Sequence, residues 1–154
     1  MSLFRIGALE YEFCRGEEEN VIGIHIPSDA DLTPASVEDS LKRAGFFFRT
    51  CYSEYRYEKY RCDSWLLSPV LKTLLPEESN IVSFQKRFQI MQEDRESKEF
   101  IEWLFQKPEN TDCKILPENT GLQKRAKALL LKGGTIGSAA GEMPAAKYDS
   151  RFKI

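Results

Sequence analysis

The fold is decided by residues 60–92, which read Tyr60-Arg-Cys-Asp-Ser-Trp-Leu-Leu-Ser-Pro-Val-Leu-Lys-Thr-Leu-Leu-Pro-Glu-Glu-Ser-Asn-Ile-Val-Ser-Phe-Gln-Lys-Arg-Phe-Gln-Ile-Met-Gln92. This is the densest apolar stretch of the chain, and prolines and capping residues divide it into four pieces. Tyr60 to Leu67 has the aromatic and apolar content of a strand. Two short helices follow, and residues 88–92 resemble a second strand. The order strand, helix, helix, strand is typical of a sheet that carries helices on its faces.

Each of the two short helices has a recognisable beginning. The first begins at Ser68-Pro69, because serine is a favourable N-cap and proline lacks only an amide hydrogen that the first turn does not use. Pro76 ends it, since proline cannot continue a helix. Ser79 or Asn80 caps the second helix. The side chains expected on the buried faces of the two helices are Val70, Leu71, Leu74, Leu75, Ile81, Phe84 and Phe88.

The residues before this stretch predict a hairpin and a long helix. Leu3 to Cys14 alternates loosely between two faces, and Val21 to Ile26 returns after a charged turn, so the two segments form a hairpin. Thr33-Pro34 repeats the cap-and-proline start, and a helix follows from Pro34 to Arg49. The buried stripe expected on this helix is Val37, Leu41, Ala44 and Phe48.

The residues after it predict two more helices and a tail. Ser97 to Phe105 is amphipathic and indicates a helix, with a strand around residues 103–105 as the alternative. Thr120 caps a helix from Gly121 to Lys132, and Gly133-Gly134 ends it. We therefore expect a single domain over residues 1–137. The small and polar residues from 138 to 154 predict a flexible or disordered tail.

Together these elements predict an α+β fold in which a mixed β-sheet is flanked by helices. We expect the segments 4–13, 21–26, 60–67 and 88–92 to be strands of one sheet. A length of 154 residues suits one domain, and 42% hydrophobic with 30% charged residues is ordinary for a globular protein.

Charge and cysteine content exclude several classes of partner. The formal net charge is -2, so no global basic field favours nucleic acid, and no apolar run approaches the roughly 20 residues of a membrane span. The histidine at position 25 is the single one, and no cysteine pair has the spacing of a metal site, so we expect no metal. Free thiols at four cysteines are typical of a cytoplasmic protein. The cysteines are Cys14, Cys51, Cys62 and Cys113.

Three pieces of the sequence resemble a known family. The first is the run from Ser64 to Phe88, with its Ser-Trp-Leu-Leu-Ser-Pro and Leu-Leu-Pro motifs; the second joins Arg5–Phe13 to Ile24-His-Ile-Pro27; the third is Leu116–Gln123. As a set, they resemble the C-terminal, GNAT-like domain of a poorly characterised bacterial acyltransferase-type family. In that family the domain follows an N-terminal acyltransferase-like region, so the resemblance implies such an upstream region as a partner.

The resemblance also implies a site between two strands. In a GNAT fold two neighbouring parallel strands splay apart, the pantetheine of acyl-CoA bonds to the backbone of the first, and its pyrophosphate lies at the N-terminus of the next helix. Here the strands would be Val21–Ile26 and Tyr60–Leu67, and the helix Pro34–Arg49. The implied substrate is acyl-CoA or acetyl-CoA. The residues that would bind it are Ile24, His25, Ile26 and Ser28.

Three side chains on these strands are candidates for catalysis. His25 could act as a general base, because imidazole titrates near neutral pH, although a strand histidine is also often packed and hydrogen-bonded. Cys62 and Ser64 share one face of the second strand, and Cys62 as a nucleophile would need His25 as its base. The alternative for Cys62 is an inert buried thiol.

The loop Ser28-Asp-Ala-Asp-Leu-Thr33 departs from the GNAT pattern. GNATs carry glycines here, which let backbone amides reach the phosphates, whereas this chain has Asp29 and Asp31. Two carboxylates beside a diphosphate are repulsive. The other interpretation of Ser and Asp at this place is a turn before a helix.

An aromatic surplus predicts a docking surface. Residues 46–57 hold more large rings than one helix face can bury, and the first strand would lie at an open sheet edge. We expect a homodimer through that edge or through the tyrosines, unless the rings pack on one another.

These observations support one leading function and two alternatives. The leading hypothesis is the C-terminal domain of a GNAT-like acyltransferase that contributes part of an acyl-CoA cleft and is inactive alone. The rival is a non-catalytic interaction or oligomerisation domain that docks a catalytic partner region. A free-standing enzyme of other chemistry ranks last.

Overall fold

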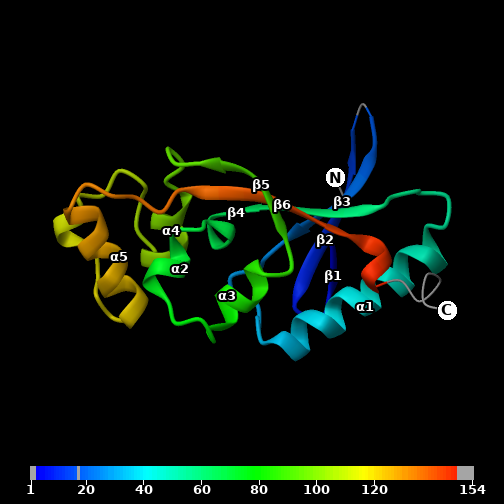
Figure 1. The fold of residues 1–154 in the computed structure, drawn as a ribbon, viewed down its shortest axis with the longest axis horizontal. Coiled ribbons are helices and arrows are strands. Elements are labelled where there is room, and N and C mark those ends of the chain that lie inside the picture. Colours follow the sequence, from blue (N-terminus) through cyan, green and yellow to red (C-terminus); the bar gives the residue numbers. More distant parts are fainter. Residues whose placement is uncertain (1–2, 17, 149–154) are drawn as a thin grey trace.

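A six-stranded sheet runs through the computed structural model, which describes residues 3–16 and 18–148 (Figure 1). The strand order is β1-β2-β3-β4-β6-β5. The strands are β1 (Phe4–Ile6), β2 (Leu9–Arg15), β3 (Asn20–His25), β4 (Lys59–Ser64), β5 (Gln89–Asp94) and β6 (Ser138–Pro144). β3 and β4 are parallel, and each other pair of neighbours is antiparallel. The predicted α+β fold with a mixed sheet is therefore confirmed, and the four segments predicted as strands lie in one sheet.

The first predicted strand is a tight hairpin rather than one strand. Ile6 pairs with Leu9, and the chain reverses through Gly7 and Ala8. Gly7 has a φ of 63°, a left-handed conformation that glycine adopts without steric cost. Because β1 pairs with β2 alone among the described strands, it forms one edge of the sheet.

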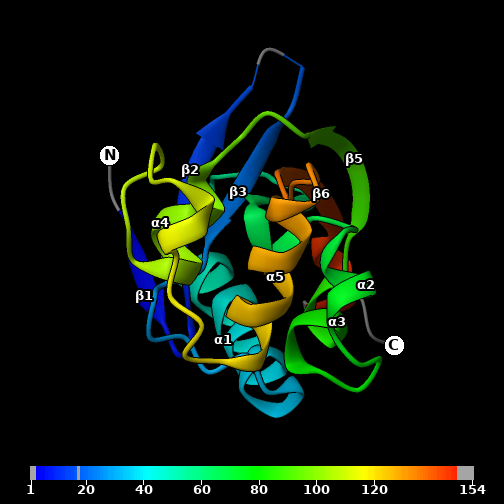
Figure 2. The same ribbon diagram turned by 90° about the vertical axis from the view of Figure 1, so that its left-hand side faces the viewer.

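The helices form two groups. α1 (Pro34–Cys51) and α3 (Asn80–Gln85) contact each other, whereas α2 (Leu71–Leu74), α4 (Glu99–Phe105) and α5 (Gly121–Leu131) gather beyond the C-terminal end of β4 (Figures 1 and 2). Short 3-10 turns connect the elements, namely η1 (Trp65–Leu67), η2 (Cys113–Ile115) and η3 (Ala145–Tyr148). The helical interpretation of residues 99–105 is correct, and the strand alternative is wrong. The second predicted strand is shorter than expected, because η1 begins at Trp65.

Each group of helices has its own apolar core. The first core joins α1 to the sheet and contains, among others, Tyr11, Ile22, Leu41, Phe48 and Tyr60. The second contains Trp65, Leu66, Leu71, Phe100, Ile101, Phe105, Leu116, Ala126 and Ile136. Ile26 and Leu32 pack against both cores. The segment that follows β3 therefore lies at the junction of the two cores, which is where the candidate site forms.

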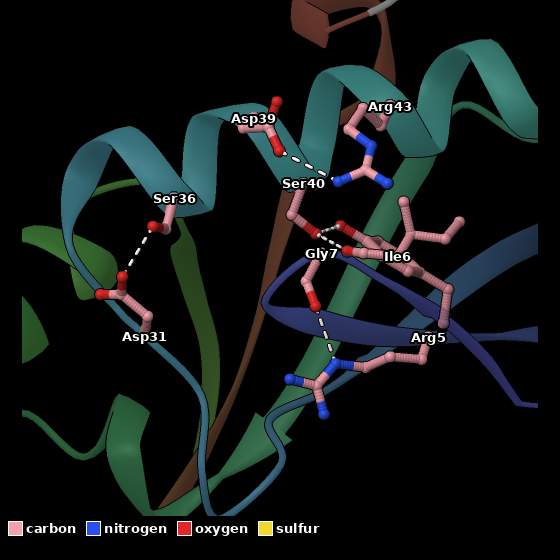
Figure 3. Close-up of polar contacts among 9 residues, drawn as sticks. Arg5, Ile6, Gly7, Asp31, Ser36, Asp39, Ser40 and Arg43 are labelled. Atoms are coloured by element: carbon pink, nitrogen blue, oxygen red, sulfur yellow. Dashed lines mark hydrogen bonds and ion pairs between the residues drawn. The ribbon is translucent and has the colours of Figure 1, made fainter.

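A buried polar contact fixes α1 against the β1–β2 hairpin. The Ser40 hydroxyl donates to the Ile6 carbonyl at 2.5 Å (Figure 3) and lies 2.8 Å from the Tyr11 hydroxyl. Burial raises the pKa of Tyr11, so the phenol stays protonated and the contact joins neutral groups. The predicted stripe of α1 is buried as expected, with Val37, Leu41, Ala44 and Phe48 inward. Thr33, the expected cap, makes no side-chain cap bond.

The expectation of a flexible tail from residue 138 is wrong for residues 138–148. β6 pairs with β4 from Ser64↔Ala139 to Lys59↔Pro144 and with β5 on its other side, so it lies inside the sheet. Its small residues are a packing requirement: a Cβ on Gly141 would lie 3.0 Å from the Phe88 Cβ. The sequence of β6 was mistaken for a disordered tail because small residues such as Gly and Ala are common both in disordered segments and in closely packed strands. Residues 149–154 of the predicted tail lie outside the described residues.

Candidate functional site

A cleft opens where the two parallel strands stop pairing. The β3–β4 ladder runs from Ile22↔Tyr60 to Ile24↔Cys62 and ends there. β4 continues through Asp63 and Ser64, which pair with β6 on the other edge of β4 and have no partner in β3. Beyond the last pair lies a cleft of about 560 Å³. Parallel strands that part in this way leave backbone groups free for a ligand.

All six residues predicted for the site line this cleft. They are Ile24, His25, Ile26, Ser28, Cys62 and Ser64. Apolar side chains from both cores complete the walls, including Leu32, Trp65, Leu66, Ile81, Leu104 and Leu122. A cleft of this size with mostly apolar walls and a few polar groups is typical of a small-molecule site. The structure thus brings the predicted residues together, while their individual roles remain predictions.

His25 is held by a carboxylate from the neighbouring strand. Its Nε2 lies 2.5 Å from Glu12 Oε1 on β2, and the imidazole is about half exposed whereas Glu12 is largely buried. A carboxylate on one ring nitrogen fixes the orientation of the ring and leaves the other nitrogen for a substrate proton. His25 is therefore hydrogen-bonded, as its alternative interpretation expects, and it also lines the cleft. Its role as a general base stays a prediction.

Cys62 has the properties of an inert thiol. Its side chain is buried, and desolvation by burial together with the neighbouring Asp63 raises the pKa of the thiol. The nucleophilic species is the thiolate, which this environment disfavours. The structure therefore weighs against the nucleophilic role and in favour of packing.

Thiol labelling tests this distinction. At about pH 8 a reagent such as DTNB should modify the exposed Cys51 about tenfold or more faster than Cys62, because burial raises the pKa of the Cys62 thiol and shields it from the reagent. Peptide mass spectrometry of a time course gives the two rates. Cys51→Ser should remove the fast phase and Cys62→Ser should leave it. Equal labelling of the two thiols in the folded chain would contradict the assignment.

Ser64 and Ser28 differ in how strongly they are held. The Ser64 hydroxyl accepts a hydrogen bond from the Leu66 amide at 3.0 Å and caps η1, so one of its lone pairs is occupied. Ser28 is exposed in the loop between β3 and α1. Ser64 can still donate its hydroxyl hydrogen into the cleft, and Ser28 lies at the rim.

Sequence reasoning missed an acidic group in the cleft. Glu99, in the first turn of α4, lines it together with Asp63. Desolvation by burial and the Asp63 carboxylate raise the pKa of Glu99, while a hydrogen bond from the Trp65 amide lowers it. The local sequence marks Glu99 only as an acidic residue at a helix start, a favourable position in any helix. Its proximity to β4 depends on tertiary packing through Trp65.

The aromatic surplus packs largely on itself. Phe4, Phe13, Phe47, Phe48 and Tyr52 form a continuous set of ring contacts, with centroid separations of 5.1 to 6.3 Å. A hollow of about 930 Å³ lies beside the tyrosines and shares no lining residue with the cleft. Two large rings stay well exposed, Phe46 at 61% and Trp103 at 49%. The predicted docking surface is therefore smaller than the sequence suggested.

Two features are absent from the part of the chain that the structure describes. No helix within residues 3–16 and 18–148 is long and apolar enough to cross a bilayer. Over the same residues, no three His, Cys, Asp or Glu side chains lie together as metal ligands would.

Comparison with known proteins gives one family and several structures. The model of a family described as GNAT-like C-terminal domain matches residues 3–143. A crystal structure of an acyltransferase in complex with decanoyl-CoA is 27% identical, with a TM-score of 0.84 over 92% of this chain and 45% of that one. Another, of an acyltransferase in complex with CoA and 10C-teicoplanin, is 24% identical, with a TM-score of 0.84 over 93% of this chain and 46% of that one. The chain thus spans about half the length of the structures it matches. A search of curated proteins found no match.

Proposed function

Because the chain belongs to the family of GNAT-like C-terminal domains, we propose that it is the C-terminal domain of an acyltransferase and contributes part of an acyl-CoA cleft. The observation that carries the proposal is the cleft at the end of the β3–β4 ladder. It opens between parallel strands, at the place where the family resemblance implies the thioester. The likeness to acyltransferases crystallised with CoA and decanoyl-CoA supports a pantetheine thioester as the ligand.

The cleft offers a distinct surface to each part of such a ligand. The strand end Ile24–Ile26 provides backbone groups for the pantetheine amides, as an added strand would. The apolar walls around Trp65 and Leu104 suit an acyl chain. His25, oriented by Glu12, is the candidate general base for the acceptor, and Ser64 can donate a hydrogen bond to the reacting group. We assign Cys62 to packing.

We propose further that the chain acts with an upstream acyltransferase-like region and is inactive without it. The matched structures are about twice as long as this chain, which supports a second half. A homodimer through β1 remains part of the proposal, because β1 is an edge strand and Leu3 is exposed beside it. Free cysteines support a cytoplasmic location.

One observation favours the alternative of an interaction domain. A hollow of about 700 Å³ follows the β1 edge, and Leu3 and Phe46 are exposed in it. Its lining is five apolar residues, Leu3, Phe4, Ile6, Phe46 and Phe47, and three basic ones, Arg5, Lys42 and Arg43. An apolar hollow beside an open edge is typical of a protein contact. Both functions can coexist, since this hollow and the cleft have only Leu3 in common.

Calorimetric titration tests the acyl-CoA proposal. We expect decanoyl-CoA to bind the chain and to bind about tenfold or more tightly than acetyl-CoA, because eight more methylenes can be buried on the cleft walls. Leu122→Trp, at a half-buried residue of α5 that lines the cleft, should abolish binding of both by filling the cleft, whereas Ile115→Trp, at an exposed residue of η2, should change neither affinity. Failure of both thioesters to bind the chain and a longer protein that includes the upstream region would overturn the proposal.

A further inference from the structure

The start of α1 is already occupied by a carboxylate of the chain itself. Asp31 Oδ1 accepts a hydrogen bond from the Thr33 amide at 3.0 Å, and its Oδ2 accepts one from the Ser36 hydroxyl at 2.8 Å (Figure 3 shows the Ser36 contact). The hydrogen bonds from Thr33 and Ser36 hold the pKa of Asp31 below its usual range, so the group is an anion at neutral pH. A negative charge therefore stands beside the positive end of the helix dipole.

Few donors remain there for a second anion. A helix start offers four amide groups outside its own bonding. Here two of the four are lost, because the Thr33 amide is bonded to Asp31 and Pro34 has no amide hydrogen. Residues 27–33 contain no glycine, so the loop backbone cannot approach a phosphate as a glycine-rich loop does.

The charges around the helix start also disfavour an anion. The hollow at this place is lined by three carboxylates, Asp29, Asp31 and Asp39, and by a single guanidinium, that of Arg5. Arg5 is itself engaged: its Nε donates to the Gly7 carbonyl at 2.7 Å, and its Nη1 lies 3.3 Å from Asp29. Asp39 is paired with Arg43 on the side of the helix. A diphosphate placed in this hollow would meet more negative than positive charge.

The cleft itself gives the diphosphate no alternative site. Its ionisable lining groups other than Cys62 are Glu10, His25, Asp63 and Glu99, with no lysine or arginine among the described residues that line it. The walls next to the strand end are apolar instead. The part of a thioester that suits them is the acyl chain with its uncharged pantetheine arm.

We infer that this domain recognises the acyl-pantetheine part of a thioester. The Asp31 carboxylate, bound at the N-terminus of α1, prevents the diphosphate from binding there. The inference rests on the proposed function and specifies its ligand. The donor class is then any acyl thioester on a pantetheine arm, whether the arm is joined to the nucleotide of CoA or to another carrier. Asp31 acts as a specificity-determining residue that excludes phosphate.

Titration of the chain with decanoyl-CoA and decanoyl-pantetheine tests the inference. We expect the two dissociation constants to agree within about threefold, and the constant for decanoyl-CoA to change less than about threefold between low and high salt, since no buried cationic pocket is being screened. A dissociation constant for decanoyl-CoA that is about thirtyfold lower and rises steeply with salt would overturn it, because the diphosphate would then have a site of its own.

Two variants separate the role of Asp31 from a general effect. Asp31→Asn keeps one oxygen that can accept from the Thr33 amide, and it places an amide NH2 where it can donate to the Ser36 hydroxyl. Because the charge is removed, it should strengthen decanoyl-CoA binding about threefold and leave decanoyl-pantetheine binding unchanged. Asp112→Asn is the matched control, because Asp112 makes the same kind of bond to the Lys114 amide, away from the cleft. An equal response of both ligands to Asp31→Asn would contradict the inference. Failure of both thioesters to bind would instead overturn the proposed function, and the inference with it.

Discussion

Replacement of Gly137 by alanine should lower the free energy of unfolding by about 3 kcal/mol or more, because it combines backbone strain with a clash. Gly137 precedes β6 and has a φ of 68°, where a Cβ is strained. A Cβ there would also lie 2.5 Å from the Asp94 carbonyl oxygen and 2.9 Å from the Arg95 Cα. Both neighbours are backbone atoms at the end of β5, so relief requires β5 and β6 to separate.

Gly133→Ala is the matched control for this prediction. Gly133 also has a positive φ, of 90°, but a Cβ there would have no atom within 4 Å. Gly133→Ala should therefore lower the free energy of unfolding by about 1 kcal/mol, which is the effect of the backbone conformation alone. Urea denaturation followed by fluorescence gives both values, and an unchanged m-value would show that they compare the same two states. A loss no larger for Gly137→Ala than for Gly133→Ala would contradict the tight packing of the β6 start.

His25→Ala should slow acyl transfer by about a hundredfold or more in the protein that includes the upstream region, since a positioned general base contributes at least that factor. The substitution removes the imidazole that Glu12 orients at the cleft. The rate is followed as release of the CoA thiol from decanoyl-CoA. Binding of decanoyl-CoA should change little, because the proposed role of His25 concerns the acceptor.

Two carboxylates on β2 allow the orientation of the His25 ring to be distinguished from a general effect of negative charge at the cleft. Glu12→Gln weakens the contact to His25 and should lower the maximal rate about tenfold, with little change in the Michaelis constant for decanoyl-CoA. Glu10 is the control: it is the register partner of His25, yet its carboxylate makes no hydrogen bond to the imidazole in the described structure. Glu10→Gln should therefore leave the rate within about twofold. Equal losses in the two variants would indicate a general effect of charge at the cleft and would contradict the role given to Glu12.

The parts of the fold that local chemistry determines could be predicted from the sequence. Pro34 at a helix start and the apolar stripe from Val37 to Phe48 predicted α1 because capping and periodicity act within one segment. The strands β3 and β4 were found for the same reason, since their alternation is visible in six residues. That β3 and β4 are neighbouring parallel strands was implied by the family resemblance, because the spacing of residues along the chain does not show which strands pair.

The missed features depend on contacts between distant segments. The bond from Glu12 to His25 requires the β2–β3 register, and the entry of Glu99 into the cleft requires α4 to pack on η1. Neither contact leaves a local pattern. The cap of α1 was assigned to Thr33, whereas Asp31 reaches past it to the Thr33 amide and the Ser36 hydroxyl. Short polar side chains near a helix start compete for the same donors, and the sequence alone does not rank them.

The position of β6 also has a consequence for how the chain is made. A ribosome releases β1 to β5 before it releases residues 138–144, yet β6 is the strand that β4 and β5 both pair with. Until then β5 has no partner strand among the described elements, and one edge of β4 stays open. Unpaired strand edges on a nascent polypeptide are sites of wrong pairing, and contacts between residues far apart in sequence form slowly. The sheet can therefore close only after this segment has been translated, and the β4 edge is open to wrong pairing until then.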